Sequence, residues 1–297
     1  MIVRLISNRL VWGSYPSRMW LSIEDKPMAN FQEQRSLPVV AAGPGWLVID
    51  KPSGISVHND PGRDVCSSVS AMLIRDRQLA DRTAFGGDGV HAPHRLDRDT
   101  SGLVLLCCTM PVLRFFGRAF QEGRIGKRYL AILHGRLEPL EGAGGEGVWS
   151  FPLAQAGGGR ANPSGQGKRV VSRTAFEVLR YSSHYTLVAC SPLTGRTHQI
   201  RRHAKLAGHP VVGDRRYGSP RSLRYLREAQ GFERLGLHAC GLDLPLPSLK
   251  EHRVVYSRAL PPELIRLLSG DSEQPDAEWQ AVLPSIAGGK RWSENEA

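Results

Sequence analysis

The clearest helical pattern in the chain lies between residues 109 and 123. Its apolar positions are Val112, Phe115, Phe116, Ala119 and Phe120, which recur at the spacing of one helix face. Thr109 stands where an N-cap is needed, and Gly123 where a helix can stop. Aromatic stripes at this spacing usually pack against a core, so we expect this helix to be structural rather than to line a cofactor site.

Other segments alternate between strand-like and helix-like patterns. The strand patterns cover residues 46–50, 102–108, 127–135, 170–181, 185–190, 237–247 and 252–257, and the helical ones cover 68–80, 197–208 and 261–270. The helix at 197–208 would place Ile200, Ala204 and Ala207 on one face, with Thr197 as its cap and Gly208 at its end. The glycine-rich stretch 141–168 predicts mainly loop. This order of elements is consistent with an α+β fold.

The pattern also suggests where the domain begins and ends. Residues 1–40 show no sustained period and carry Pro16, Pro27 and Pro38, so we treat them as an N-terminal extension. Residues 41–268 contain all of the predicted elements and form one domain. Residues 269–297 are acidic and polar with little to bury, and we expect them to be disordered.

The net charge of the chain indicates which class of partner it binds. The 297 residues carry 39 lysines and arginines against 28 acidic residues, a formal net charge of +11, which suits a polyanion such as RNA. A membrane partner is not expected, because the longest apolar run is the short LVLLCC and Arg4 and Arg9 interrupt any signal-peptide core. The five cysteines include no C-x-x-C pair, which favours the reducing cytoplasm.

The segment HRLDRDTSGLVLL, residues 94–106, joins dense charge to an apolar strand. Asp97 and Asp99 would share a face of an extended segment, so a paired acid/base device such as that of glycosidases is geometrically possible. Arg95 and Arg98 flank them and would keep both ionised, which favours a nucleophile or an anchor over a proton donor. As a fragment, the sequence DTSG is more typical of a turn before a strand than of a catalytic pair.

A second charged segment, TGRTHQIRRHAKLAGHPVVGDRRYG, follows at residues 194–218. Thr197 and Arg201 point together from the predicted helix, and an arginine held near an aspartate would lower the pKa of that aspartate by roughly 1 to 3 units. The histidines at 198, 203 and 209, and those in HAPH, lie among cations and lack an acidic zinc motif, so no metal site is expected. The G-x-x-x-x-G-K-[ST] motif of P-loop NTPases, which binds nucleotide phosphates, does not occur in the sequence either.

These segments together resemble the RluA-type pseudouridine synthases. HRLDRDTSGLVLL resembles the catalytic motif of that family, and LVIDKPSGISVH, KRYLAILHG, GRTHQIRRHAKLAGHPVVGDRRYG and LHACGLDL agree in the same order. The match covers residues 40 to 265 approximately. It departs at Arg202, where the family usually has a small apolar residue, and the extension contains no recognisable N-terminal RNA-binding module. Arg202 would alter packing or add a phosphate contact.

The resemblance implies an α+β catalytic domain with a mainly antiparallel mixed central sheet and a cleft. It implies isomerisation of uridine to pseudouridine in a structured RNA, rRNA or tRNA, by a monomer without cofactor or metal. Asp97 would be the nucleophile, Tyr129 would lie against the base and move a proton, and Arg201 would pair with Asp97. The expected substrate-binding residues are His94, Arg95, Arg196, Thr197, His198, Gln199 and Leu237.

Isomerisation of a uridine within RNA requires that the uracil be flipped out of its stack and held while the glycosidic bond breaks. Water must be excluded during this step. Arg95 would contact the flipped nucleotide or fill the space that it leaves. Attack on the ribose carbon and a glycal route are both compatible with the sequence. Two alternatives stand beside the synthase: a non-catalytic RNA-binding protein of the same fold, and a glycosidase or RNA hydrolase that uses Asp97 with Asp99.

Overall fold

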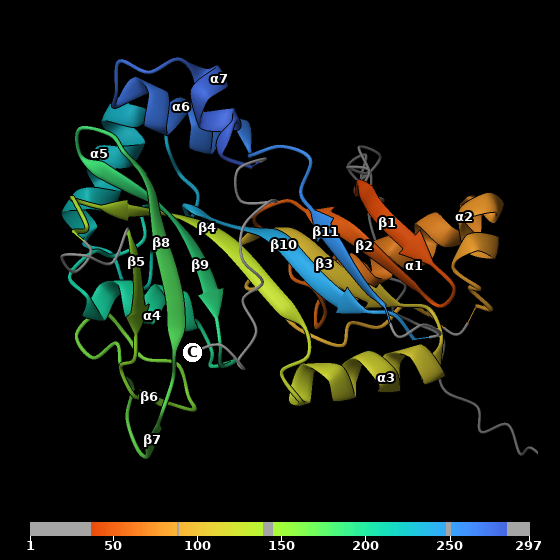
Figure 1. Ribbon diagram of the computed structural model, residues 1–297. Helices are drawn as coiled ribbons and strands as arrows, with labels where there is room; N and C mark the ends of the chain where they lie inside the picture. The colour runs from red at the N-terminus through yellow and green to blue at the C-terminus, as the bar shows by residue number, and fades with distance from the viewer. Residues whose placement is uncertain (1–36, 88, 139–144, 248–250, 284–297) are drawn as a thin grey trace, which may run out of the picture. The chain divides into compact units, whose positions relative to one another are not determined.

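The structure is a computed structural model that describes residues 37–87, 89–138, 145–247 and 251–283 (Figure 1). Most of the extension predicted for residues 1–40 lies outside the described residues. The prediction set its end slightly too late, since strand β1 (Val39–Gly43) already belongs to the sheet.

One long sheet organises the described chain. Its strands are β1, β2 (Trp46–Lys51), β3 (Ser101–Cys107), β10 (Leu237–Pro245), β4 (Gly126–His134), β9 (Tyr185–Pro192), β8 (Thr174–Tyr181) and β5 (Glu146–Trp149), in that order, with β11 (His252–Tyr256) paired to β10. Every pairing is antiparallel except that of β3 with β10. The predicted α+β class with a mainly antiparallel mixed sheet is confirmed.

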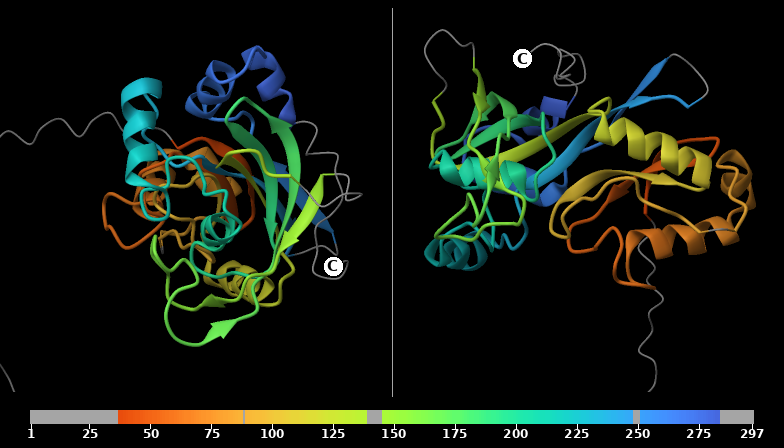
Figure 2. Two further views of the ribbon diagram at one scale, coloured as in Figure 1. Left: turned by 90° about the vertical axis from the view of Figure 1, so that its left-hand side faces the viewer. Right: turned by 90° about the horizontal axis from the view of Figure 1, so that it is seen from below.

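Helices cover both faces of this sheet. They are α1 (Val65–Arg75), α2 (Arg77–Arg82), α3 (Met110–Gln121), α4 (Gln199–Leu206), α5 (Pro220–Gln230), α6 (Pro262–Gly270) and α7 (Asp276–Gln280). In the right-hand view of Figure 2, α1 and α3 lie on opposite sides of the strands between them. A separate small hairpin, β6 (Leu153–Ala154) with β7 (Arg169–Val170), stands beyond α4.

Strand alternation assigns each helix to its face. In β2, Leu47 and Ile49 share a core cluster with α1, while Trp46 and Val48 share one with Phe116 of α3. The strands of the other half, β4 and β9, divide their side chains in the same way between α4 and the α6–α7 pair. Because period-two alternation sends neighbours to opposite faces, each half of the sheet has a two-sided core.

Several predicted boundaries change in the structure. The segment 68–80 forms two helices, because Asp76 ends α1 and its carboxylate caps α2 by accepting from the Leu79 N–H. Helix α4 starts at Gln199, so Thr197 is not its N-cap; that position is His198, in the left-handed conformation. The helix predicted between Thr109 and Gly123 is confirmed as α3, and its Phe116 is fully buried.

Several elements were not expected, among them the short strands β5 and β6 in the stretch predicted as mainly loop, and the helices α5 and α7. Helix α5 follows the second charged segment, and Leu226 is its one buried residue among those described, which explains why its sequence carries no apolar stripe. The prediction that residues 269–297 are disordered is wrong for the described part of that stretch, which includes α7. Trp279 of α7 is fully buried against the α6 cluster. Residues 284–297 lie outside the described residues.

Candidate active site

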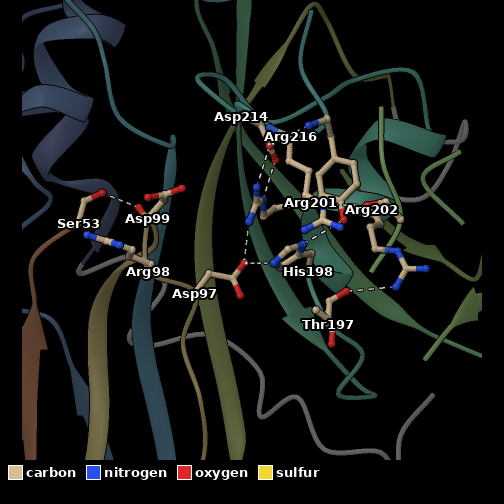
Figure 3. Close-up of polar contacts among 12 residues, drawn as sticks. Ser53, Asp97, Arg98, Asp99, Thr197, His198, Arg201, Arg202, Asp214 and Arg216 are labelled. Atoms are coloured by element: carbon tan, nitrogen blue, oxygen red, sulfur yellow. Dashed lines mark hydrogen bonds and ion pairs between the residues drawn. The ribbon is translucent and has the colours of Figure 1, made fainter. Parts of the chain in front are cut away.

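Asp97 lies in the loop that leads into β3, and a tight turn shapes this loop. The Thr100 N–H donates to the Asp97 carbonyl at 3.1 Å, which closes the turn. From the segment after β2, the Ser53 hydroxyl donates to the Asp99 carbonyl at 2.6 Å (Figure 3). The chain is therefore bent between Asp97 and Asp99, and the extended geometry that would place both carboxylates on one face is absent from this loop.

Lys51 anchors the same turn from beneath. Its side chain is fully buried at the end of β2, and its ammonium donates to the carbonyls of Pro52, Ile55 and Arg98 at 2.8–3.0 Å. Burial lowers the pKa of Lys51 to about 7, against the opposing negative charges of Asp99 and Asp97. Lys51 thus holds the backbone one residue after Asp97 without touching its carboxylate.

Arg201 joins Asp97 to a second carboxylate. Its Nη1 donates to Asp97 Oδ2 at 2.9 Å, while Nε and Nη2 form a two-pronged contact with Asp214 at 2.7 and 2.8 Å (Figure 3). Burial alone would lower the pKa of Arg201, but the hydrogen bonds and charges of Asp214 and Asp97 raise it above its ordinary value. The guanidinium is therefore a permanent cation with a fixed orientation.

Asp214 is fully buried, and both of its carboxylate oxygens accept hydrogen bonds. Its Oδ1 also accepts from the backbone N–H groups of Arg216 and Tyr217, at 2.9 and 3.0 Å. The Tyr217 ring packs beside the Arg201 guanidinium, 5.3 Å from its carbon to the ring centroid. The loop that follows α4 thus fixes Arg201 from behind, and Arg201 then orients Asp97.

His198 stands on the other side of the Asp97 carboxylate. Its Nε2 lies 3.7 Å from Asp97 Oδ2, and its Nδ1 shares a hydrogen bond with the Tyr217 hydroxyl at 3.0 Å. Burial lowers the pKa of His198, and the negative charge of Asp97 opposes that shift. The left-handed backbone, with φ at 54°, turns the imidazole toward Asp97, an uncommon conformation for a residue other than glycine.

Two cavities meet at Asp97. One, of about 560 Å³, is rich in cations and lined among others by Arg95, Arg215 and Arg216. The other, of about 430 Å³, includes Tyr129 and Leu237 in its wall. Asp97, His198 and Arg201 line both. The carboxylate thus stands between a basic compartment and a more apolar one.

Tyr129 is part of the wall of the apolar compartment. It lies on β4 at the middle of the sheet, where it packs against the core clusters of both halves. Burial, and next the negative charge of Asp97, raise the pKa of Tyr129 above its ordinary value, so the phenol stays protonated at neutral pH. Its hydroxyl takes part in none of the hydrogen bonds found among the described residues, and its side chain lines the cavity, where a ligand can reach it.

The other predicted substrate-binding residues all line the apolar cavity. The amide of Gln199 is already occupied: it donates to Arg173 and Thr174 and accepts from Thr194 and Arg196. His94 accepts from the Leu105 N–H at 2.9 Å and stacks on Phe120, and burial lowers its pKa to about 3. These two side chains therefore shape the cavity wall.

Arg196 has a hydrogen-bond donor without a partner in this cavity wall. Its Nε is buried with no partner among the described residues, as is rare for a polar atom outside a functional site. Thr197 contributes its carbonyl to another arginine, Arg202, at 3.2 Å. Leu237 is buried at the start of β10 and presents an apolar surface near Asp97.

The sequence interpretation missed three contributors. Asp214 and Tyr217 stood within the quoted GDRRYG stretch but received no role, and Lys51 stood within LVIDKPSG. An aspartate beside arginines, thirteen positions after Arg201, carries no local sign that it will face back into the site. Across the described ranges, no group of three or more potential metal-ligating side chains is arranged around one point, and no helix is long and apolar enough to span a membrane.

Comparison with known proteins places this geometry in a family. Residues 45–206 match the family model described as RNA pseudouridylate synthase. The chain is 37% identical over 207 residues to Ribosomal large subunit pseudouridine synthase C of Escherichia coli K12, covering 69% of this chain and 61% of that protein. For the Vibrio cholerae protein of the same name the identity is 33% over 214 residues, covering 71% and 62%.

The chain thus spans about three-fifths of the length of these curated relatives. A solved structure, Human RNA Pseudouridylate Synthase Domain Containing 1, superimposes with a TM-score of 0.60 at 26% identity, covering 85% of this chain and 96% of the human one. The sequence match runs through the Asp97 loop, β4 and α4, the elements that build the site. The chain belongs to the RNA pseudouridylate synthase family.

Proposed function

We propose that this protein converts a specific uridine of large-subunit ribosomal RNA to pseudouridine, with Asp97 as the nucleophile. The observation that carries the proposal is the Asp97 carboxylate, oriented by Arg201 and exposed to two cavities of different character. Family membership supports the reaction class. The printed names of the relatives support ribosomal RNA as the substrate class.

The two cavities suit the two parts of a nucleotide. Uracil flipped out of its helix would enter the more apolar compartment, where Tyr129 and Leu237 supply surface for the ring. The phosphates would follow the basic compartment, where Arg95, Arg215 and Arg216 offer cations. Asp97, at the boundary of the two, would then stand beside the glycosidic bond.

The chemistry is an isomerisation, so its atoms balance within the substrate. The N1–C1′ bond breaks, a C5–C1′ bond forms, and the proton of C5 is exchanged for one on N1. The carboxylate of Asp97 would either form an ester at C1′ or remove a ribose proton to give a glycal, and it is regenerated by either route. The Tyr129 hydroxyl, which stays protonated, would relay the proton at the uracil by donating its own proton as it accepts the other.

Retention of the cut base is the main demand on the site. A free base would leave and water would hydrolyse the sugar intermediate, so the cavity must exclude water while the base turns over. The buried Leu237 and the Tyr129 ring provide such a wall. Arg201 stabilises Asp97 as an anion both before attack and after release, because its own position is fixed by Asp214.

The alternatives are less well supported by the geometry. A hydrolase that uses Asp97 with Asp99 needs both carboxylates to face one bond, yet the turn separates them and Asp99 is exposed. A non-catalytic RNA-binding protein would have no use for a carboxylate held by a buried arginine and a second buried carboxylate. Loss of activity in single variants separates these alternatives.

The test is pseudouridine-specific chemical mapping of rRNA and tRNA from cells with and without this gene. We expect one or a few uridines of large-subunit rRNA to lose the modification in the deletion strain. Restoring the gene should return it, and the Asp97→Asn variant should not. Loss of a tRNA site in place of an rRNA site would overturn the substrate class, and no lost site in either RNA would overturn the activity.

A further inference from the structure

Strand β10 joins the half-sheet of β1, β2 and β3 to the half-sheet of β4, β9, β8 and β5 (Figure 1). It is paired with β3 at two residue positions, Ser101 with His238 and Gly102 with Ala239, whereas β2 is paired with β3 at six. The backbone connection between the two halves is therefore short. Since Asp97 precedes β3 and Arg201 follows β9, the contact between them depends on how this junction is held.

A chain of side-chain hydrogen bonds crosses the same junction. Arg234 donates to the Ser101 hydroxyl at 2.5 Å, and Ser101 is bonded to Nδ1 of His238 at 2.9 Å. On the other side of the ring, Nε2 of His238 is bonded to Ser257 at 3.1 Å, and the Ser257 hydroxyl donates to Asp50 at 2.5 Å. The chain therefore connects β2, β3 and β10 with the segments that precede β10 and follow β11.

The two ends of this chain fix the direction of every hydrogen bond in it. Because an arginine can only donate, the Ser101 oxygen accepts from Arg234 and its own proton is available to Nδ1 of His238. Nε2 of His238 then carries the ring proton and donates to Ser257, which donates in turn to Asp50. Burial, and next the positive charge of Arg234, lower the pKa of His238 to about 3, so the ring is neutral as the chain requires.

The chain lies next to residues of the apolar cavity wall. Ser101 follows Thr100 and His238 follows Leu237, and both of these neighbours line that cavity. The Thr100 N–H also closes the turn at Asp97, so one residue separates the chain from that turn. A shift of Ser101 against His238 would therefore be passed to Asp97.

We propose that His238, together with the hydrogen-bonded chain it completes, is a positioning residue that fixes β3 against β10 and so keeps Asp97 aligned with Arg201. The inference rests on the proposed function, in which the aligned Asp97 is the nucleophile. His238 lines neither cavity and acts through Asp97. The effect can be large, because a reacting group displaced by about 1 Å can lose about a hundred-fold in rate.

A polar chain suits this role better than apolar packing alone. Apolar side chains can slide against one another at little cost, whereas directional hydrogen bonds between buried groups specify one arrangement. Leucine in place of His238 would break the chain at its centre. Ser101 would keep its bond from Arg234, and Ser257 would keep its bond to Asp50, so neither charged end would lose its partner.

The test compares His238→Leu and His238→Gln with the wild type and with His134→Leu. His134 is the matched control, because it also bonds a serine hydroxyl, that of Ser222 at 2.8 Å, but lies at the far end of β4 and lines neither cavity. Hydrogen exchange without RNA should quicken in segments 97–104 and 236–242 of His238→Leu, and less so in His238→Gln, whose amide can still donate to Ser257. The control should keep wild-type exchange in both segments.

Activity is measured on large-subunit rRNA from the deletion strain. For His238→Leu, kcat should fall by about ten-fold or more, while KM stays within about three-fold because the cations of the basic cavity are unchanged. His238→Gln should recover part of the loss, and His134→Leu should keep the wild-type kcat. A loss of kcat in the control equal to that in His238→Leu would overturn the inference.

A double variant separates positioning from a structural role. Arg201→Lys keeps the positive charge but cannot bind Asp214 and Asp97 in the same fixed plane, so the alignment of Asp97 is already lost in it. Adding His238→Leu to this protein should then lower kcat by less than about three-fold. A full ten-fold further loss would mean that His238 does not act through Arg201 and Asp97.

Other results would also overturn the inference. Unchanged exchange in both segments would mean that the chain does not hold the junction, and a rise in KM at constant kcat would mean that His238 affects RNA binding instead. If His238→Leu does not fold, Ser101→Ala breaks the chain beside it while Arg234 keeps its ion pair with Glu263, and the same loss of kcat is expected. An unchanged kcat in Ser101→Ala would count against the inference.

The proposed function can fail without deciding this inference. If the wild type modifies no uridine, exchange of the Thr100 amide replaces kcat, because this N–H closes the turn at Asp97. Faster exchange there in His238→Leu, but not in His134→Leu, would support the role of the chain in holding Asp97. Equal exchange in the two variants would overturn it.

Discussion

Arg201 is shared between two carboxylates that do different work. Asp214 is buried and takes two of its donors, and Asp97 is partly open to both cavities and takes one. The division would leave the proposed nucleophile, Asp97, available despite a strong ion pair, because Arg201 is immobilised mainly by Asp214. The identities of Asp97, Arg201 and Tyr129 followed from the resemblance, but the role of Asp214 required the structure.

Asp97→Asn should reduce the rate of pseudouridine formation by about a thousand-fold or more, because an amide is neither a nucleophile nor a base for the ribose. Asp99→Asn is its matched control, since Asp99 is exposed and contributes its backbone carbonyl to Ser53. We expect the control to keep activity within about ten-fold. Equal losses in both variants, measured in single turnover, would favour the paired-carboxylate hydrolase.

Asp214→Asn should both destabilise the protein and lower kcat. It leaves the Arg201 cation buried with only Asp97 to neutralise it, and breaking one side of a buried pair costs about 3 to 5 kcal/mol of unfolding free energy. Asp81→Asn, on the exposed side of α2, should change it by less than about 0.5 kcal/mol. Urea unfolding measures both. A stable Asp214→Asn variant with normal kcat would show that Asp97 needs no fixed arginine.

Lys51 predicts a pH dependence of stability. Its pKa of about 7 in the folded protein lies below the ordinary value of 10.5 in the unfolded chain. Between those values the unfolded state binds more protons, so the contribution of Lys51 to stability rises with pH, by up to about 1.4 kcal/mol per unit. Below pH 7 both states are protonated and the slope vanishes.

The measurement is the difference in unfolding free energy between the wild type and Lys51→Met, from pH 6 to 10. Subtraction removes the titration of every other group that the substitution leaves unchanged. We expect the difference to shift in favour of the wild type as the pH rises above about 7. A flat difference would mean that Lys51 keeps an ordinary pKa in the folded protein.

At the scale of elements, periodic patterns predicted well and caps predicted poorly. Helix α3 has an uninterrupted apolar stripe, and the structure confirms it between Thr109 and Gly123. The N-cap of α4 is His198 rather than the predicted Thr197, because His198 adopts a left-handed conformation and faces Asp97, so tertiary contacts there override capping preference. Helix α5 has one buried residue among those described, so no periodic pattern marked it.

The close approach of β3 and β10 at Gly102 leads to a testable prediction. It lies in β3 directly opposite Ala239 of β10, with φ at +113°, and a side-chain carbon there would collide with the Ala239 backbone. Gly102→Ala should therefore push the two strands apart, destabilise the protein by more than about 1 kcal/mol and displace the Asp97 loop. Gly270→Ala in α6 is the control, because nothing lies within 4 Å of the added carbon and Gly270 lines neither cavity.

That control should be neutral or slightly stabilising, since alanine favours helices by about 1 kcal/mol over glycine. Thermal unfolding and the rate of pseudouridine formation report on the two effects separately. If Gly102→Ala unfolds like the wild type and keeps its rate, the close approach of β3 and β10 is not required for the site.

At the scale of the whole molecule, the formal charge of +11 predicts salt-sensitive RNA binding. Each phosphate neutralised by a cation releases counterions, so the logarithm of the binding constant should fall linearly with the logarithm of salt concentration. Arg95→Met should reduce that slope by about 0.7 to 0.9, because Arg95 is exposed and lines both cavities.

Arg266→Met on α6 removes the same charge away from the cavities and should leave the slope unchanged. Filter binding of large-subunit rRNA from the deletion strain, at salt concentrations from 50 to 300 mM, measures both. An equal reduction in both variants would show that the net charge, rather than the cavity, governs association, and no reduction in either would show that Arg95 neutralises no phosphate.

The arrangement of the sheet could not be deduced from the sequence. Local patterns located most strands, yet strand order depends on pairings between residues far apart, such as Ser101 with His238. The resemblance supplied the fold class where periodicity could not. The candidate site residues form a group for the same reason: Asp97 and Arg201 are separated by 104 positions and meet because β10 and β4 join β3, which follows Asp97, to β9, which precedes α4, in one sheet.

The position of β10 in the sheet determines when, during synthesis of the chain, the two parts of this site can assemble. Strand β10 is made late, yet it lies between β3 and β4, which are made early. A nascent chain on the ribosome can pair β1 with β2 and β3, and separately β4 with β9 and β8. These two half-sheets have no shared strand until residues 237–245 emerge. Asp97 belongs to the first half and Arg201 to the second, so the two side chains can be held together only after β10 has emerged.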